Sequence, residues 1–181
     1  MSASPQDLMT AKLFFNAAFP TMQVLLDDDP KLHKKFQNFN ATVQFGAMND
    51  GELLCCHLIF QNGNLTVVQG PAEKSDISLT FSSVEKMNSL LKGGLSLPSI
   101  KGNLSLLPNV LSILMGLKIM TKPNDKLKND TEKLLKVKCS LYMITRALSQ
   151  YNKLGDPDMQ EFCRRQPDRI YQFQVEHDGQ P

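Results

Sequence analysis

Three histidines are the candidates for acid–base chemistry, and they are not grouped in the sequence. His33, His57 and His177 are far apart and fall in different kinds of predicted element. An imidazole needs a neighbouring group to tune it for catalysis, and His57 sits on the less apolar face of its predicted strand. The sequence also has no GxSxG, GxxxxGK or GxGxxG motif. These residues therefore predict a protein that is not an enzyme.

The potential metal ligands have simpler explanations. Asp27–Asp29 precede His33, but this spacing matches no zinc or calcium pattern, and an aspartate before Pro30 is a good helix cap. The cysteines contain no CxxC pair: Cys55, Cys56, Cys139 and Cys163. They are predicted to be small buried residues in a reducing compartment. We expect no catalytic residue, no metal site and no cofactor.

The composition fits a soluble protein with one domain and an appendage. The 181 residues carry a formal net charge of +2, which is too small to indicate a nucleic-acid partner. No signal peptide is visible. The apolar run 102–117 contains Asn103, Pro108 and Asn109, and we expect it to be too short to span a membrane. A cytoplasmic location is the resulting expectation.

Helical and strand patterns follow one another along the chain. Ser4-Pro5 starts a helix, Phe19-Pro20 is expected to break it, and Asp29-Pro30 starts another. Apolar residues then alternate in four predicted strands, which end near Phe81 and are joined by turns such as Asn62-Gly63. Hairpin connections of this kind predict an antiparallel meander.

The remaining elements are mostly helical. A capped helix over 83–92, a fifth strand near 97–101, and an apolar helix over 108–121 follow the meander. A long helix is predicted over 125–154, and a last strand over 171–175.

Helix 108–121 carries apolar side chains on nearly every side. It is typical either of a buried core helix or of a helix with one face lining a cavity for an apolar ligand. Nine methionines favour the second interpretation, because methionine adapts to varied shapes. The residues predicted to line the cavity are Phe14, Phe81, Leu90, Ile100, Leu107, Val110, Leu111, Leu114 and Met115.

The C-terminal third differs in character. Helix 125–154 has an apolar stripe at alternating intervals of three and four: Leu134, Val137, Leu141, Ile144, Leu148 and Tyr151. This stripe fits either a helix packed across its own domain or the seam of a homodimer. The segment Lys118–Lys138 contains seven lysines and three acidic residues. It is expected to contact anionic membrane surfaces, with a solvated lysine face as the alternative.

Several short motifs resemble, in their order and spacing, the sterol carrier protein type 2 domain over residues 31–117. The matching segments are Thr42–Phe45, Asn62-Gly63, Ser75–Leu79, Ser82–Leu91 and Ile100–Asn103. The resemblance implies an α+β fold, with a five-stranded, largely antiparallel sheet and helices on one face that enclose an apolar tunnel. Residues 1–122 would form this domain, and 123–181 a helical extension packed on it, ending in a strand.

The same resemblance implies a function without catalysis. Such a domain would bind a hydrophobic lipid in its tunnel: a fatty acid, acyl-CoA, phospholipid, sterol or isoprenoid quinone. It could also transfer or present that lipid. The alternative is an assembly subunit, or an accessory domain of a lipid- or quinone-modifying enzyme, that dimerises through helix 125–154. No nucleic-acid partner is expected.

Overall fold

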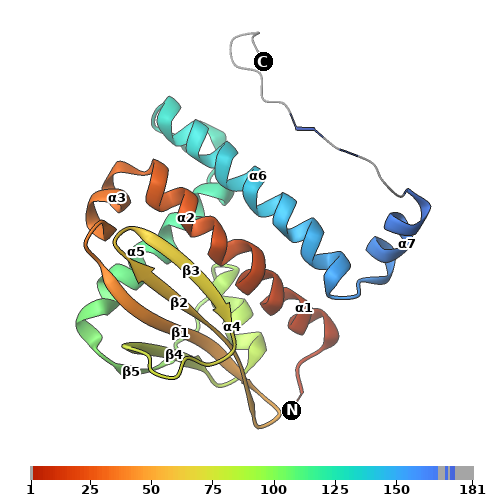
Figure 1. The fold of residues 1–181 in the computed structure, drawn as a ribbon, viewed down its shortest axis with the longest axis horizontal. Helices are drawn as coiled ribbons and strands as arrows, with labels where there is room; N and C mark the ends of the chain where they lie inside the picture. Colours follow the sequence, from red (N-terminus) through yellow and green to blue (C-terminus); the bar gives the residue numbers. More distant parts are fainter. Residues whose placement is uncertain (1, 167–169, 171, 174–181) are drawn as a thin grey trace.

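A five-stranded sheet organises the first two thirds of the chain (Figure 1). The computed structural model describes residues 2–166, 170, 172 and 173, and in this part the strand order is β3-β2-β1-β4-β5. The strands are β1 (Asn40–Asn49), β2 (Glu52–Gln61), β3 (Asn64–Gln69), β4 (Ile77–Phe81) and β5 (Ser99–Gly102). The predicted α+β class with a largely antiparallel sheet is confirmed.

The first three strands form the predicted meander. β1 pairs with β2, and β2 with β3, both antiparallel. Asp50 and Asn62 each have a positive φ and each precede a glycine that also has one. Two successive positive φ angles match the right-handed twist of the flanking strands, which explains why these dipeptides make tight hairpins.

The predicted antiparallel meander is wrong at the fourth strand, because β4 runs parallel to β1. The chain leaves β3 and reaches the free edge of β1, where the Thr42 amide donates to the Asp76 carboxylate at 2.7 Å. Ile77, Leu79 and Phe81 are all buried. Between β1 and β5 these three side chains are covered better than they would be at the outer edge of β3. This burial is the physical reason why the chain crosses over to β1 after β3.

The helices lie on one side of the sheet in Figure 1. Along β4 the buried residues alternate with half-buried Ser78 and Thr80, as expected for a sheet with one covered face. The helical segments before the long helix are α1 (Pro5–Leu13), η1 (Phe14–Ala18), α2 (Phe19–Asp28), α3 (Pro30–Phe36), α4 (Val84–Leu91), η2 (Leu104–Leu106), α5 (Leu107–Gly116), η3 (Leu117–Thr121) and η4 (Asn124–Lys126).

The predicted break at Phe19-Pro20 is wrong. α1 continues through the π-helical turn η1 directly into α2. Pro20 then falls in the first turn of α2, where the missing N–H is tolerated. The predicted caps at Ser4 and Asp29 are confirmed, since their side chains accept backbone N–H groups at the starts of α1 and α3. The predicted helix over 83–92 begins one residue later, at Val84, with Ser83 as its cap.

Aromatic side chains join the helical layer to the sheet. Phe19 of α2 lies edge-on to Phe45 of β1 with ring centroids 5.2 Å apart, and Phe45 lies 5.4 Å from Phe81 of β4. All three are buried. Burial of each ring contributes roughly 1.5–3 kcal/mol, so these contacts hold the helices in place on the sheet.

Polar contacts fix the N-terminal helix to α4. The Asn88 side-chain amide donates to the Asp7 backbone carbonyl at 3.0 Å and to its carboxylate at 3.2 Å. Hydrogen bonds from Ser4 and Asn88 lower the pKa of the Asp7 carboxyl. Asp7 is therefore held as the charged acceptor in the first turn of α1, where the helix dipole also favours a negative charge.

The long helix α6 (Asp130–Lys153) begins five residues later than predicted, at an Asn129 cap. It lies against η1, α2 and η3, and it is followed by α7 (Pro157–Arg165). The prediction of buried cysteines is confirmed for Cys55, Cys56 and Cys139, but Cys163 on α7 is exposed. The predicted strand over 171–175 lies mostly outside the described residues.

Candidate functional site

The helical run formed by η2, α5 and η3 is apolar and largely uncovered. Within Leu104–Thr121 only 11% of the residues are buried. Val110 and Ile113 are the buried ones, and they face inward where α5 lies against α2 and α3. On the outer side, Leu111 is 48% exposed and Met115 is 56% exposed. An apolar helix of this kind presents a surface suited to hydrophobic ligands.

The apolar helical run ends four residues beyond the 102–117 stretch considered in the sequence. The 18 residues Leu104–Thr121 are long and apolar enough to cross a membrane, by length and composition alone. Pro108 does not interrupt it, because proline is tolerated in the first turn of α5. Asn103 lies before the run and caps η2 through its side chain. One helix that meets this criterion does not by itself establish a membrane span.

The nine residues predicted to line a cavity fall into three groups. Phe81 and Val110 are buried in the core, and Leu111 and Met115 are exposed. The others are half-buried and pack against the core: Phe14, Leu90, Ile100, Leu107 and Leu114. Seven of the nine thus belong to one apolar cluster, while Leu111 and Met115 form the outer surface of α5.

Gly116 allows the close seating of α5 on the helical layer. A Cβ atom at this position would lie 2.9 Å from Leu25 Cδ1 and 3.1 Å from Leu32 Cδ1. These distances are shorter than ordinary van der Waals contacts, so a larger residue would force the buried side chains of Leu25 and Leu32 to shift. The sequence pattern alone did not single out Gly116, because the need for a small residue arises from the packing of distant segments.

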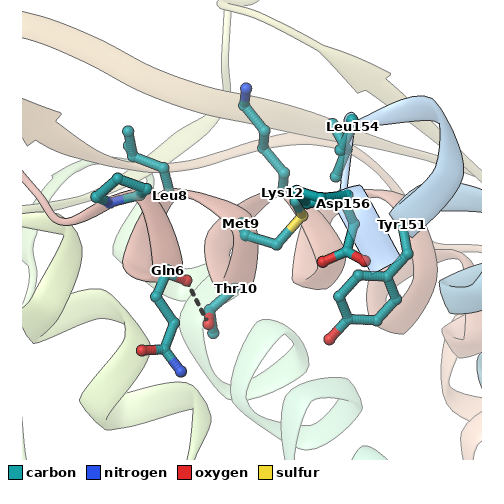
Figure 2. A pocket seen from close by; sticks show the side chains of 11 residues that line it. Gln6, Leu8, Met9, Thr10, Lys12, Tyr151, Leu154 and Asp156 are labelled. Carbon is teal, nitrogen blue, oxygen red and sulfur yellow. Dashed lines mark hydrogen bonds between the residues drawn. The ribbon is translucent and has the colours of Figure 1, made fainter. Parts of the chain in front are cut away.

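Cavities occur elsewhere on the molecule. One of about 600 Å³ lies between α1 and the corner joining α6 to α7 (Figure 2). Its walls combine apolar groups with the charged side chains of Lys12 and Asp156, and Asp156 also caps α7. The apolar lining residues that the sequence reasoning missed are Leu8, Met9, Tyr151 and Leu154. None of the nine predicted residues lines this cavity.

Most of the lysines in the basic segment Lys118–Lys138 are already bound within the protein. Lys122 pairs with Glu132 at 2.6 Å, and the same contact lowers the pKa of that carboxyl. Three more ammonium groups have partners within the protein. Lys133 forms an ion pair with Asp130, Lys138 forms one with Asp28, and Lys136 donates a hydrogen bond to the Lys122 carbonyl. Within the described residues, the ammonium groups of Lys118, Lys126 and Lys128 make no hydrogen bond or ion pair.

A second set of basic residues flanks α5. The helix α3 lies against α5, and the Lys35 ammonium donates to the Pro108 carbonyl at 3.0 Å. Lys31 and Lys34 on the same short helix are exposed. Sequence reasoning missed this set, because α3 precedes α5 by some seventy residues and only the fold brings them together.

The histidines of the described residues are bound to the backbone. Each histidine in this part donates a ring N–H to a backbone carbonyl, His33 to Leu26 at 2.9 Å and His57 to Gly70 at 3.0 Å. No group of three or more histidine, cysteine, aspartate or glutamate side chains in this part of the chain could hold a metal ion. The site is therefore an apolar surface with cationic groups at its margin.

Comparison with known proteins finds similarity to solved structures. No family model matches the chain, and no curated protein matches it. A crystal structure of sterol carrier protein 2 aligns with a TM-score of 0.45 and 14% identity, over 57% of this chain and 96% of that chain. A solution structure of the sterol carrier protein domain 2 of Helicoverpa armigera aligns with a TM-score of 0.42 and 20% identity, over 65% of this chain and 94% of that chain.

Both similar structures carry the name of the family that the sequence resembles. They are likenesses of fold. The function proposed below rests on the residues of this chain.

Proposed function

We propose that this chain binds a hydrophobic lipid without catalysing a reaction, and that the outer face of α5 contacts the lipid. The observation that carries the proposal is the uncovered apolar run Leu104–Thr121, with Leu111 and Met115 exposed on it. Removing apolar surface from water contributes about 25 cal/mol per Å², so a lipid chain lying along this helix is stabilised. Both histidines of the described residues are bound to backbone carbonyls, and this part of the chain has no group of side chains that could hold a metal ion, which agrees with a binding role.

A co-purifying ligand tests this proposal directly. We expect native mass spectrometry of freshly purified protein to show an adduct with the mass of a fatty acid, acyl-CoA, phospholipid, sterol or quinone. Removal of the adduct by organic extraction, followed by rebinding of a fluorescent fatty acid, would support the same function. A protein that is free of lipid and takes up none of these probes would contradict the proposal.

We further propose that the same surface docks on anionic membranes. Exposed Leu111 and Met115 would enter the interfacial region, while Lys118 and the α3 lysines lie beside them. A lysine near an anionic surface contributes roughly 1 kcal/mol, and salt screens this attraction. Lys126 and Lys128 add cationic groups that have no partner within the described part of the protein.

Liposome sedimentation checks the role of the unpaired lysines. The triple variant Lys118→Glu, Lys126→Glu, Lys128→Glu should bind anionic vesicles at least about tenfold more weakly than the wild type, because three favourable charges are reversed. The matched control is Lys12→Glu, Lys74→Glu, Lys153→Glu, which changes the net charge equally at exposed positions. Wild-type binding that is insensitive to salt, or an equal loss in the control, would contradict a localised docking surface.

A further inference from the structure

The cavity between α1 and the corner joining α6 to α7 is a concave site to which α5 contributes no residue. Its volume of about 600 Å³ falls within the roughly 300–1,000 Å³ that is typical of small-molecule sites. Leu8 and Met9 come from α1, and Tyr151 and Leu154 from the end of α6 (Figure 2). All four side chains are half-buried, so two segments far apart in the sequence supply apolar walls.

Two opposite charges line this cavity, and they do not pair with each other. The Lys12 ammonium makes no hydrogen bond or ion pair with any described residue. Asp156 Oδ1 accepts the Met159 backbone N–H at 2.9 Å, while the second carboxylate oxygen accepts no hydrogen bond from the described part of the chain. The walls therefore offer a cationic donor and an anionic acceptor that can both still bind a ligand.

We infer that this cavity binds an apolar zwitterion from solution: a short apolar peptide with free termini, or an apolar amino acid. The ligand ammonium pairs with the second oxygen of Asp156, its carboxylate pairs with Lys12, and its side chains cover Met9 and Leu154. A purely anionic ligand is repelled by Asp156 and a purely cationic one by Lys12, so only a ligand with both charges complements both walls.

This binding goes beyond the lipid function proposed for α5 and does not depend on it. The cavity shares no residue with the surface proposed to dock on membranes. That separation favours a ligand free in solution over the headgroup of a membrane lipid.

Isothermal titration calorimetry with dileucine tests the site. Asp156→Asn should weaken binding about tenfold, because a charge-assisted hydrogen bond at a half-buried carboxylate is lost. Asparagine caps helices as well as aspartate does, so α7 stays capped in this variant. Lys12→Gln should weaken binding about three- to fivefold, because an ion pair at an exposed ammonium contributes less.

The matched controls are Asp158→Asn and Lys153→Gln, at neighbouring exposed positions that do not line the cavity. Both should bind dileucine as the wild type does. No heat of binding to the wild type at about 10 mM dileucine, or an equal loss in the controls, would overturn the proposal.

Ligands that lack one charge assign each contact. N-acetyl-dileucine has no ammonium, so Asp156→Asn should not weaken its binding. Dileucine amide has no carboxylate, so Lys12→Gln should not weaken its binding. A variant that weakens dileucine and its one-charge analogue by the same factor would show that the substituted residue does not pair with that charge.

Two comparisons separate this site from lipid binding. Dihexanoyl phosphatidylethanolamine carries both charges on a lipid, and tighter binding of this probe than of dileucine would overturn the choice of a ligand free in solution. Leu111→Asp should bind dileucine as the wild type does, whereas Lys12→Glu should weaken dileucine binding and leave binding to anionic vesicles unchanged. Failure of this site and failure of the α5 surface are thus seen separately.

Discussion

Replacing Leu111 by aspartate is expected to abolish uptake of a fluorescent fatty acid while leaving the fold intact. Leu111 is exposed, so the free protein tolerates a charge there. In the complex the new carboxylate would lie against acyl chain, and burying an uncompensated charge costs several kcal/mol. Met115→Asp on the next turn should behave in the same way. Leu114 is a poorer test position, because it is half-buried against the core and aspartate there would also destabilise the protein.

The matched control is Leu53→Asp on β2, where the leucine is also exposed, 37% against 48% for Leu111. It makes the same chemical change on a strand that is not proposed to contact lipid. Urea unfolding of all three variants should give free energies of unfolding close to that of the wild type. Unchanged uptake by folded Leu111→Asp and Met115→Asp would remove the outer face of α5 from the site.

Replacing Gly102 by alanine should produce the largest loss of stability. Gly102 has a φ of +102°, and a Cβ atom there would collide with the Asp76 carbonyl oxygen and approach Ile77 Cα to 3.0 Å. Both contacts are with backbone atoms, those of Ile77 at the start of β4 and of Asp76 just before it, which cannot rotate away as a side chain can. Strain at the positive φ costs about 1–2 kcal/mol, and separating β5 from β4 adds to it, for an expected total of roughly 3–5 kcal/mol.

Gly93→Ala separates the two contributions. Gly93 has a similar φ of +92°, but a Cβ atom there would meet nothing within 4 Å. Thermal or urea unfolding should therefore show only the strain of about 1–2 kcal/mol in this variant. Equal destabilisation by the two substitutions would show that contact with Asp76 has no effect. Because only Asn103 separates Gly102 from the run that contains α5, Gly102→Ala should also weaken lipid uptake.

Local signals in the sequence were sufficient for most elements. The caps at Ser4 and Asp29 and the Asn62-Gly63 turn were predicted correctly, because each depends on residues only a few positions apart. The parallel pairing of β4 with β1 was missed because it depends on segments that are far apart in the sequence. A turn after β3 shows that the strand ends, but the choice of partner depends on which open edge covers the apolar side chains of β4.

The sequence identified the helix that forms the candidate site, but not which side of that helix is exposed. Apolar content identified α5, but periodicity could not show which of its sides the domain would cover, so Val110 and Leu111 were grouped together. The α6 stripe was found by its spacing. Its outward direction became clear only when Leu135 and Cys139 proved to be the buried face. An enclosed apolar tunnel stays a prediction, as does the division of the chain at residue 122.

The distribution of the cysteines makes this protein convenient for site-selective chemistry. Alkylation requires a thiolate, and burial raises the pKa of Cys139 to about 12 and that of Cys55 and Cys56 as well. Cys163 on α7 is exposed to solvent. A maleimide dye added to the folded protein should therefore attach at Cys163, beside the corner that joins α7 to α6. The natural chain thus provides a handle for following the movement of its C-terminal helices by fluorescence.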